Sequence, residues 1–306
     1  MIYIVGRRHC GSTILDIVLG NAGNAQGVGE LVFGLSHYPH ERVTGGGTVA
    51  TNPFWVRVRE AFERTPGLSL PEASRKLNDA FRLRQLPRLL FASSRSRRIQ
   101  ELCELLERLY QAISDAAGKD IIIDSGKRVT QALFLARFFA HARIVHLVRN
   151  PASVMSSHLK RARKGETVAF LGRRIEGRRV GWLMCLYLAC NWSIGTSLAW
   201  WVETCWRPKC TRLRFEDFLK DPHSSVVHLG SELDLDVTSV LERMEQQLPL
   251  SCDANIGGNR VRFENRLSVD SQRAAPTQLP KSLRWIVLVF SFPLLRAFGY
   301  REDLRA

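Results

Sequence analysis

The sequence Met1-Ile-Tyr-Ile-Val-Gly-Arg-Arg-His-Cys-Gly-Ser-Thr-Ile-Leu15 decides how the rest of the chain is interpreted. Residues 2–5 are apolar and mostly β-branched, which predicts a buried strand. Residues 6–11 carry a glycine at each end and predict a loop, and the apolar run after Ser12 predicts a helix. A loop of this kind predicts an anion site, because its amides point at the ligand and the helix dipole favours negative charge.

This loop matches the nucleotide-binding pattern G-x-x-x-x-G-K-[ST] except at one position. Ser12 stands where the lysine belongs, and Thr13 fills the hydroxyl position. That lysine normally reaches the β- and γ-phosphates of a nucleoside triphosphate, so its absence argues against an ATPase or a kinase. A phosphate ligand remains compatible, and Arg7 and Arg8 add positive charge. An ordinary strand-to-helix turn with two glycines is the alternative for the loop taken alone.

With 306 residues, of which 45% are hydrophobic, the chain fits one large α/β domain with insertions or two small domains, and we expect a single domain over residues 1–306. The net charge of +15 suits an anionic ligand, nucleic acid or an acidic membrane surface. Because no nucleic-acid motif or zinc-finger spacing accompanies this charge, we expect no nucleic-acid partner. Seven cysteines without a C-x-x-C pair predict reduced thiols and no metal site. With no signal peptide before the first strand, a cytoplasmic location is expected.

Two apolar runs raise the question of membrane contact. Residues 180–202 carry no charge and are long enough to span a bilayer, but polar residues such as Asn191 dilute the run. We therefore expect a buried helix there. Residues 285–295 are too few to span and contain Pro293. This run predicts a terminal core helix or, with an arginine at either end, a helix lying on a membrane surface.

Further apolar strands are predicted at residues 120–124, 143–148 and 210–215. Repeated strand–helix units predict a three-layer, P-loop-type parallel sheet flanked by helices. Residues 52–118 predict a helical insert. The very basic residues 160–179 predict a lid over an anionic ligand or, alternatively, a solvated charged surface.

Polar side chains follow several of these strands, where open α/β sheets bind their ligands. Glu30 lies soon after the first loop and helix, and either faces the ligand or pairs with an arginine. Arg149 at a strand end and Ser157 in the next helix converge on one phosphate, or Arg149 is capped by carbonyls. Arg260 and Arg262, beside Gly257-Gly258, close over a phosphate or form a basic surface loop.

Together these motifs resemble the sulfotransferases that use 3′-phosphoadenosine 5′-phosphosulfate (PAPS) as donor. Residues 6–15 resemble their 5′-phosphosulfate loop. Leu147-Val-Arg-Asn-Pro151, followed by Ser157, resembles their 3′-phosphate motif. Residues 29–30, 124–127, 214–217 and 257–260 resemble segments of the carbohydrate and tyrosylprotein branch and its bacterial relatives. Residues 37–117 and 160–179 match no segment of the family, so we expect them to determine substrate choice.

The resemblance implies a role for each matching residue. Gly11, Ser12 and Thr13 hold the 5′-phosphate and sulfonate. Arg149 and Ser157 hold the 3′-phosphate, helped by Arg260 or Arg262. Glu30 matches a general base, and Lys127 a lysine that stabilises charge on the transferring group. The donor loop also contains Arg7, Arg8, His9 and Cys10.

The donor loop departs from the family at His9, where many members carry Lys or Arg. A protonated or hydrogen-bonding His9 would face the leaving oxygen, with Arg7 or Arg8 as other sources of charge. Cys10 is expected to be a tolerated small residue and not a nucleophile.

The predicted function is therefore sulfonate transfer from PAPS to a hydroxyl or amine of a small-molecule or glycan acceptor, without a metal. A P-loop nucleotide kinase or NTPase is one alternative. A non-catalytic basic binding protein on the same fold is the other.

Overall fold

The centre of the molecule is a parallel sheet. The computed structural model describes residues 1–163, 167–170, 173–176, 182–263 and 279–300. Five strands pair in the order β2-β3-β1-β4-β7, and every pairing is parallel. The strands are β1 (Ile2–Gly6), β2 (Ala25–Gly29), β3 (Ile121–Lys127), β4 (Arg143–Val148) and β7 (Cys210–Arg214).

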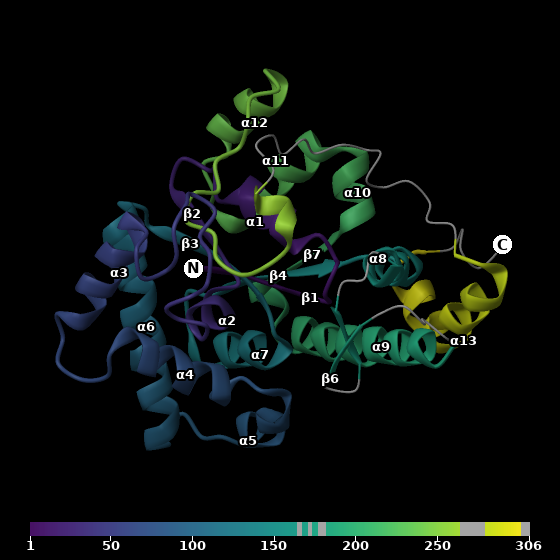
Figure 1. The fold of residues 1–306 in the computed structure, drawn as a ribbon, viewed down its shortest axis with the longest axis horizontal. Coiled ribbons are helices and arrows are strands. Elements are labelled where there is room, and N and C mark those ends of the chain that lie inside the picture. Colours follow the sequence, from purple (N-terminus) through teal and green to yellow (C-terminus); the bar gives the residue numbers. More distant parts are fainter. Residues whose placement is uncertain (164–166, 171–172, 177–181, 264–278, 301–306) are drawn as a thin grey trace.

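Helices cover both faces of this sheet, which makes three layers (Figure 1). On one face, the core contains residues of α1 (Ser12–Leu19), α10 (Phe215–Lys220), α11 (Pro222–Leu233) and α12 (Thr238–Glu245). On the other, it contains residues of α2 (Leu31–Leu35), α7 (Val129–Phe138) and the C-terminal part of α9 (Trp182–Cys205). The expected three-layer α/β architecture is confirmed.

The strands predicted near residues 120, 143 and 210 are confirmed, but β2 was not predicted. Its sequence, Ala-Gln-Gly-Val-Gly, has little intrinsic strand propensity because two of its residues are glycines. Pairing of residues 25–29 with β3 makes it the edge strand. Tertiary contacts therefore decide the conformation of this segment.

Residues 52–118 contain four helices: α3 (Pro53–Glu63), α4 (Leu70–Ala80), α5 (Leu86–Leu90) and α6 (Arg97–Ala117). The Asn52 side chain caps α3 by accepting from Phe54 N and Trp55 N. Ser69 and Glu72 form a capping box at the start of α4. Leu102, Leu106, Leu109 and Ile113 form the buried stripe of α6, which packs against α3. These helices extend the core beyond the sheet.

The remaining elements lie outside the five-stranded sheet, and one of them, the 3-10 helix at Leu83–Gln85, belongs to the insert. They are α8 (Pro151–Arg163), α13 (Lys281–Ala297), the antiparallel pair β5 (Thr167–Phe170) and β6 (Arg173–Glu176), and the 3-10 helices η1 (Leu83–Gln85), η2 (Arg207–Lys209) and η3 (Arg260–Phe263). The candidate lid at 160–179 lies partly outside the described residues. Within the described parts of the chain, no helix combines the length and apolar character needed to cross a membrane.

The parallel arrangement also fixes where a ligand can bind. Because β1, β3 and β4 are parallel, their carboxyl ends lie at the same end of the sheet. The glycine loop, Arg128 and Arg149 directly follow these three ends. Segments far apart in the sequence therefore meet at the carboxyl ends of the strands.

Candidate active site

The glycine loop is shaped by Gly11, which precedes α1 with a φ of 96°. A Cβ at Gly11 would lie only 2.1 Å from Cε2 of Phe215, so both the backbone conformation and the available space require glycine. Ser12 follows at the start of α1 and is buried. Its Oγ has no hydrogen-bond partner among the described residues. A buried hydroxyl without a partner at a helix N-terminus indicates a missing polar ligand.

The loop opens into a cavity of about 300 Å³, here called the first cavity. Its walls come from the glycine loop, the end of β3, the face of α8 and the segment around Asn259. The lining residues are His9, Gly11, Ser12, Thr13, Ile14, Lys127, Arg149, Ser153, Ser156, Ser157, Lys160, Phe215, Asn259 and Val261. Lysine, arginine and hydroxyl groups are present and this lining contains no carboxylate, so the cavity suits an anion.

The structure brings Arg149 and Ser157 into this same cavity. Arg149 Nη1 donates to the carbonyl oxygen of His9 at 3.0 Å, and its guanidinium lies 4.7 Å from the ring centroid of Phe215. Trp192 Nε1 donates to the Arg149 carbonyl at 3.1 Å. These contacts hold the arginine against the glycine loop.

Three further lining residues, Ser153, Ser156 and Lys160, were not assigned a role from the sequence. They share one face of α8 with Ser157, because residues three, four and seven positions apart lie on the same side of a helix. That spacing was the signal that would have found them.

His9 is neutral at physiological pH. Burial is the main cause that lowers its pKa to about 2, followed by the charges of His158 and Arg161. Its Nδ1 lies 3.1 Å from Ser157 Oγ, and its ring packs edge-on against that of His158 at 4.1 Å. Of the two expected forms of His9, this environment disfavours the protonated one. It favours the neutral, hydrogen-bonding one.

Glu30 and Lys127 form an ion pair beside the glycine loop. Lys127 Nζ lies 2.5 Å from Glu30 Oε1, and both side chains are partly buried. Lys127 has a φ of 65°, a conformation that costs a non-glycine residue energy and is concentrated at functional sites. This backbone conformation ends β3 where its lysine side chain reaches the first cavity.

Two buried carboxylates hold the backbone on either side of Glu30. Asp16 Oδ2 accepts from Gly29 N at 3.1 Å, and Asp124 Oδ1 accepts from Leu31 N at 3.4 Å. Burial is the main cause that raises the pKa of both aspartates to about 7. Neither aspartate was assigned a role from the sequence, although a charged residue in the otherwise apolar α1 was a signal for Asp16.

The segment around Gly257 packs against the chain at Glu30. Glu30 N donates to Ile256 O at 2.8 Å, and Asn259 N donates to Thr13 Oγ1 at 3.2 Å. A Cβ at Gly257 would lie 2.8 Å from the Cβ of Glu30, so a larger residue would push the two apart. The segment therefore links the Glu30 corner to the hydroxyl of the glycine loop.

Arg260 and Arg262 are not placed as expected from the resemblance. Neither residue lines the first cavity. Arg260 is exposed, and Arg262 is buried with its guanidinium on Glu41 Oε1 and Arg42 O, both at 3.0 Å. Arg262 also donates to the carbonyl of Gly257. Its contacts are those of a residue that fixes the loop and not of a phosphate ligand.

A second cavity, of about 480 Å³, lies on the other side of the Glu30–Lys127 pair. Lys127 lines both cavities, whereas Glu30 lines only the second. The insert contributes Phe81 and Arg82, together with Leu83 of η1. Helix α9 contributes Tyr187, Leu188, Asn191 and Trp192. The ion pair thus stands where the two cavities meet.

The other members of the predicted donor loop do not line the first cavity. Arg7 and Arg8 line the second cavity, and an Arg7 Nη2 hydrogen bond reaches Asn191 Oδ1. Cys10 is buried, and burial raises the pKa of its thiol, so it is a poor nucleophile. The cations of Arg7 and Arg8 therefore face the second cavity.

A model of the sulfotransferase family matches residues 2–239. The chain belongs to the sulfotransferase family. It also resembles the sulfotransferase domain of the Synechococcus PCC 7002 olefin synthase, with 17% identity, a TM-score of 0.54 and coverage of 96% of this chain and 94% of that one. The sulfotransferase domain from the curacin biosynthetic pathway is similar at 17% identity and a TM-score of 0.52, with 96% of each chain covered. At this identity the likeness shows a shared fold. Among curated proteins no match was found.

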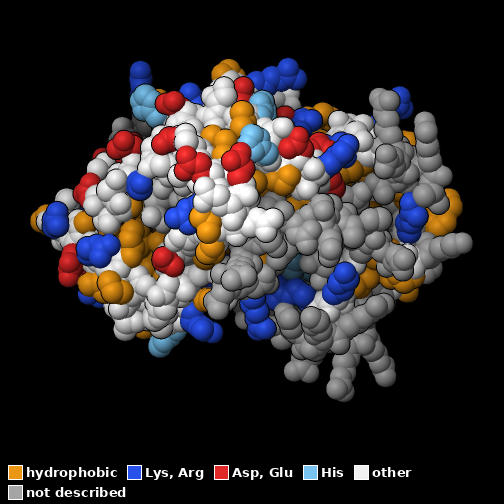
Figure 2. Space-filling model, turned by 90° about the horizontal axis from the view of Figure 1, so that it is seen from above, with side chains coloured by type: hydrophobic (Ala, Val, Ile, Leu, Met, Phe, Trp, Pro, Cys, Tyr) orange, Lys and Arg blue, Asp and Glu red, His pale blue; other side chains and the backbone are white. Residues whose placement is uncertain are grey.

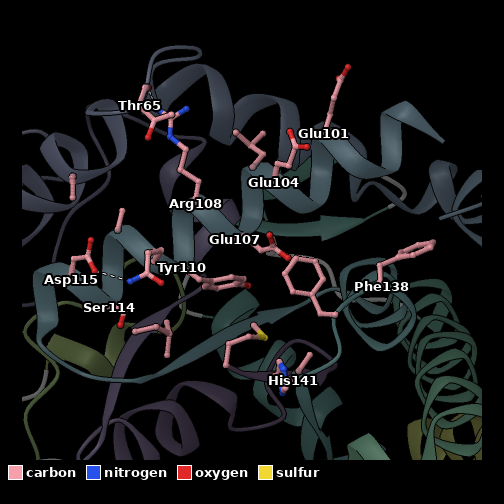
Figure 3. A pocket seen from close by; sticks show the side chains of 18 of the residues that line it. Thr65, Glu101, Glu104, Glu107, Arg108, Tyr110, Ser114, Asp115, Phe138 and His141 are labelled. Atoms are coloured by element: carbon pink, nitrogen blue, oxygen red, sulfur yellow. Dashed lines mark hydrogen bonds between the residues drawn. The ribbon is translucent and has the colours of Figure 1, made fainter. Parts of the chain in front are cut away.

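A third cavity of this sulfotransferase, of about 1330 Å³, lies at the opposite end of the strands. Met1, Asp120 and Ala142 line it, and these residues precede β1, β3 and β4. Figure 3 shows the side chains that α6 directs toward it, among them Glu104, Glu107 and Arg108. The glycine loop, Glu30 and Arg149 all lie outside its lining, so this cavity is separate from the candidate active site.

No group of three or more His, Cys, Asp or Glu side chains that could hold a metal ion occurs in the described part of this sulfotransferase. The charged groups at the candidate site are instead the lysine, arginine and carboxylate side chains described above.

Proposed function

We propose that this sulfotransferase moves a sulfonate from PAPS to a hydroxyl or amine of a small-molecule or glycan acceptor. The observation that carries the proposal is the Glu30–Lys127 pair at the junction of two cavities. One cavity is basic and adjoins the glycine loop. The other is lined by the proposed base. In-line transfer requires a base and a cation between the bound donor and the bound acceptor.

The first cavity fits the donor in three respects. The orphaned hydroxyl of Ser12 and the N-terminus of α1 suit the 5′-phosphosulfate. Arg149 and Ser157 line the same cavity and suit the 3′-phosphate. His9, kept neutral by burial, contributes as a hydrogen-bonding group and not as a cation. Bound there, PAPS supplies an activated sulfonate.

The residues of the chain then supply acid–base and electrostatic catalysis. Glu30 accepts the proton of the attacking hydroxyl or amine while the new bond to sulfur forms. The bond between sulfur and the 5′-phosphate oxygen breaks in the same displacement, and its electron pair stays on the leaving 3′,5′-bisphosphate. Lys127 stabilises negative charge on the transferring group, and Ser12 and Thr13 hold the leaving phosphate.

The second cavity is the proposed acceptor site. It is lined by aromatic and apolar side chains, such as Phe81 and Tyr187, and by arginines such as Arg82 and Arg128. This mixture suits an acceptor that carries both an apolar part and an anionic or hydroxylated part. Phe81 and Arg82 come from the insert that we expected to determine substrate choice.

All seven cysteines are free, which supports a reducing compartment such as the cytoplasm.

Calorimetric titration tests the donor assignment. We expect saturable binding of 3′-phosphoadenosine 5′-phosphate, the bisphosphate product, and no binding of ATP with or without magnesium. Tight magnesium-dependent ATP binding without a response to the bisphosphate would instead favour the nucleotide kinase. Bisphosphate binding without turnover of PAPS in a broad acceptor screen would favour the non-catalytic binding protein.

A further inference from the structure

Helix α13 is apolar on two opposite sides. Its inner side buries Val287, Leu294 and Leu295 and packs against α9 and its neighbours. On its outer side Trp285, Val289 and Phe292 are 69%, 60% and 49% exposed. Their spacing of four and then three residues places them in one stripe. A helix that is apolar on both sides is normally covered on both, so the outer stripe calls for a partner.

Helix α9, against which α13 packs, carries more exposed apolar side chains. Trp182, Leu183 and Ile194 are all more than half exposed. The stripe of Trp285, Val289 and Phe292 points away from α9, so we call only these three residues of α13 the outer face. Some apolar side chains are visible at the right-hand end of the molecule in Figure 2, the end at which Figure 1 places α13. Trp285 in this stripe favours a water–lipid boundary, where an amphipathic ring has both of its environments.

The charged residues of α13 itself are all basic. Arg284 directly precedes the stripe, and the exposed Arg296 follows Phe292 by one helical turn. The sequence of α13 contains no acidic residue, and that of α9 contains only Glu203. Glu203 is already held by Arg212 and His146, at 2.6 Å and 2.7 Å. An apolar surface with a cationic border, on a chain of net charge +15, complements an anionic lipid surface.

A second copy of the chain is a poorer complement for the same face. Symmetric pairing would bring the arginines of both copies to one interface. Within the described residues of α9 and α13 there is no unpaired carboxylate to neutralise them, so like charges would face each other.

We propose that the outer face binds the surface of a bilayer that contains anionic lipid, with α13 lying in the interface and not crossing it. This inference is independent of the proposed sulfonate transfer.

Vesicle sedimentation of the full chain tests the proposal. We expect binding to vesicles of phosphatidylcholine with phosphatidylglycerol and little binding to phosphatidylcholine alone. The double variant Trp285→Ser/Phe292→Ser should weaken binding at least about tenfold, because two large side chains lose their apolar environment. Arg296→Gln should weaken binding to the anionic vesicles only.

The matched control is Phe91→Ser, because Phe91 is 89% exposed but belongs to the insert after α5. It should bind vesicles like the unchanged protein, and thermal melting should show that all variants fold. Absence of vesicle binding, equal binding to both lipid compositions, or unchanged binding of the double variant would each overturn the proposal. Conversion of a dimer to a monomer by the double variant, without vesicle binding by the unchanged chain, would assign the face to a second copy.

Discussion

Lys127 Nζ contacts Glu30 Oε1 at 2.5 Å, although the two residues are 97 positions apart in the chain. The contact joins the end of β3 to the corner after β2. Lys127 lines both cavities and Glu30 only the second, so the pair lies between the proposed acceptor site and the proposed donor site. The proposed proton transfer and charge stabilisation both depend on this relationship.

Replacing Glu30 with glutamine should remove catalysis but retain donor binding. Glutamine keeps the size of the side chain and cannot accept the proton, so turnover should fall about a hundredfold or more. Glu30 does not line the first cavity, so bisphosphate affinity measured by calorimetry should change little. Glu104→Gln is the control, because Glu104 lines the third cavity at the opposite end of the strands. Unchanged turnover in the Glu30 variant would exclude Glu30 as the base.

Replacing Arg149 with alanine should weaken binding of the bisphosphate. The loss of a charged hydrogen-bond donor from the first cavity corresponds to about a tenfold to hundredfold decrease in affinity. Arg260→Ala removes the same charge from an exposed site outside the lining and should have little effect. Equal losses in the two variants would show that general positive charge, and not the position of Arg149, binds the ligand.

Gly11→Ala should destabilise the protein more than Gly46→Ala. Both glycines have similar positive φ values, 96° and 99°, so both substitutions carry a similar backbone cost. Only at Gly11 does the new methyl group meet the ring of Phe215, whereas nothing lies within 4 Å at Gly46. We expect an additional loss of about 1–3 kcal/mol in the free energy of unfolding at Gly11. Chemical denaturation of the two variants measures this difference, and identical losses would contradict the steric argument.

His158 should make the protein sensitive to acid. Burial, followed by the charges of Arg8 and Arg161, lowers its pKa from 6.5 to about 4. Between these values the unfolded chain binds more protons than the folded one, so the free energy of unfolding falls as the pH is lowered through this range. His158→Asn should remove up to about 2 kcal/mol of the loss between about pH 7.5 and about pH 5.

Comparison of the variant with the unchanged protein is necessary because other buried groups titrate as well. Asp16 and Asp124, whose pKa values are raised to about 7, lose their destabilising effect as the pH falls and so act in the opposite direction. Denaturant titrations at the two pH values give the difference. An acid sensitivity that is the same in both proteins would contradict a buried, uncharged His158.

Local patterns predicted much of the framework. The strands β1, β3 and β4 contain runs of apolar residues, and Pro151 marks the start of α8 after β4. The edge strand β2 escaped prediction, because two glycines leave its backbone without a preference and only pairing with β3 orders it. The single turn of helix at α2, directly after Glu30, likewise depends on its neighbours.

By itself, the sequence determined the glycine loop, the strands β1, β3, β4 and β7, and the residue types that point to an anionic ligand. These follow from interactions between near neighbours in the chain. Only the tertiary structure decided which candidates meet: it joined Glu30 to Lys127, placed Arg149 beside His9, turned Arg262 to the loop carbonyls and made His9 neutral. Contacts and burial of this kind depend on residues remote in the sequence, and no local pattern specifies them.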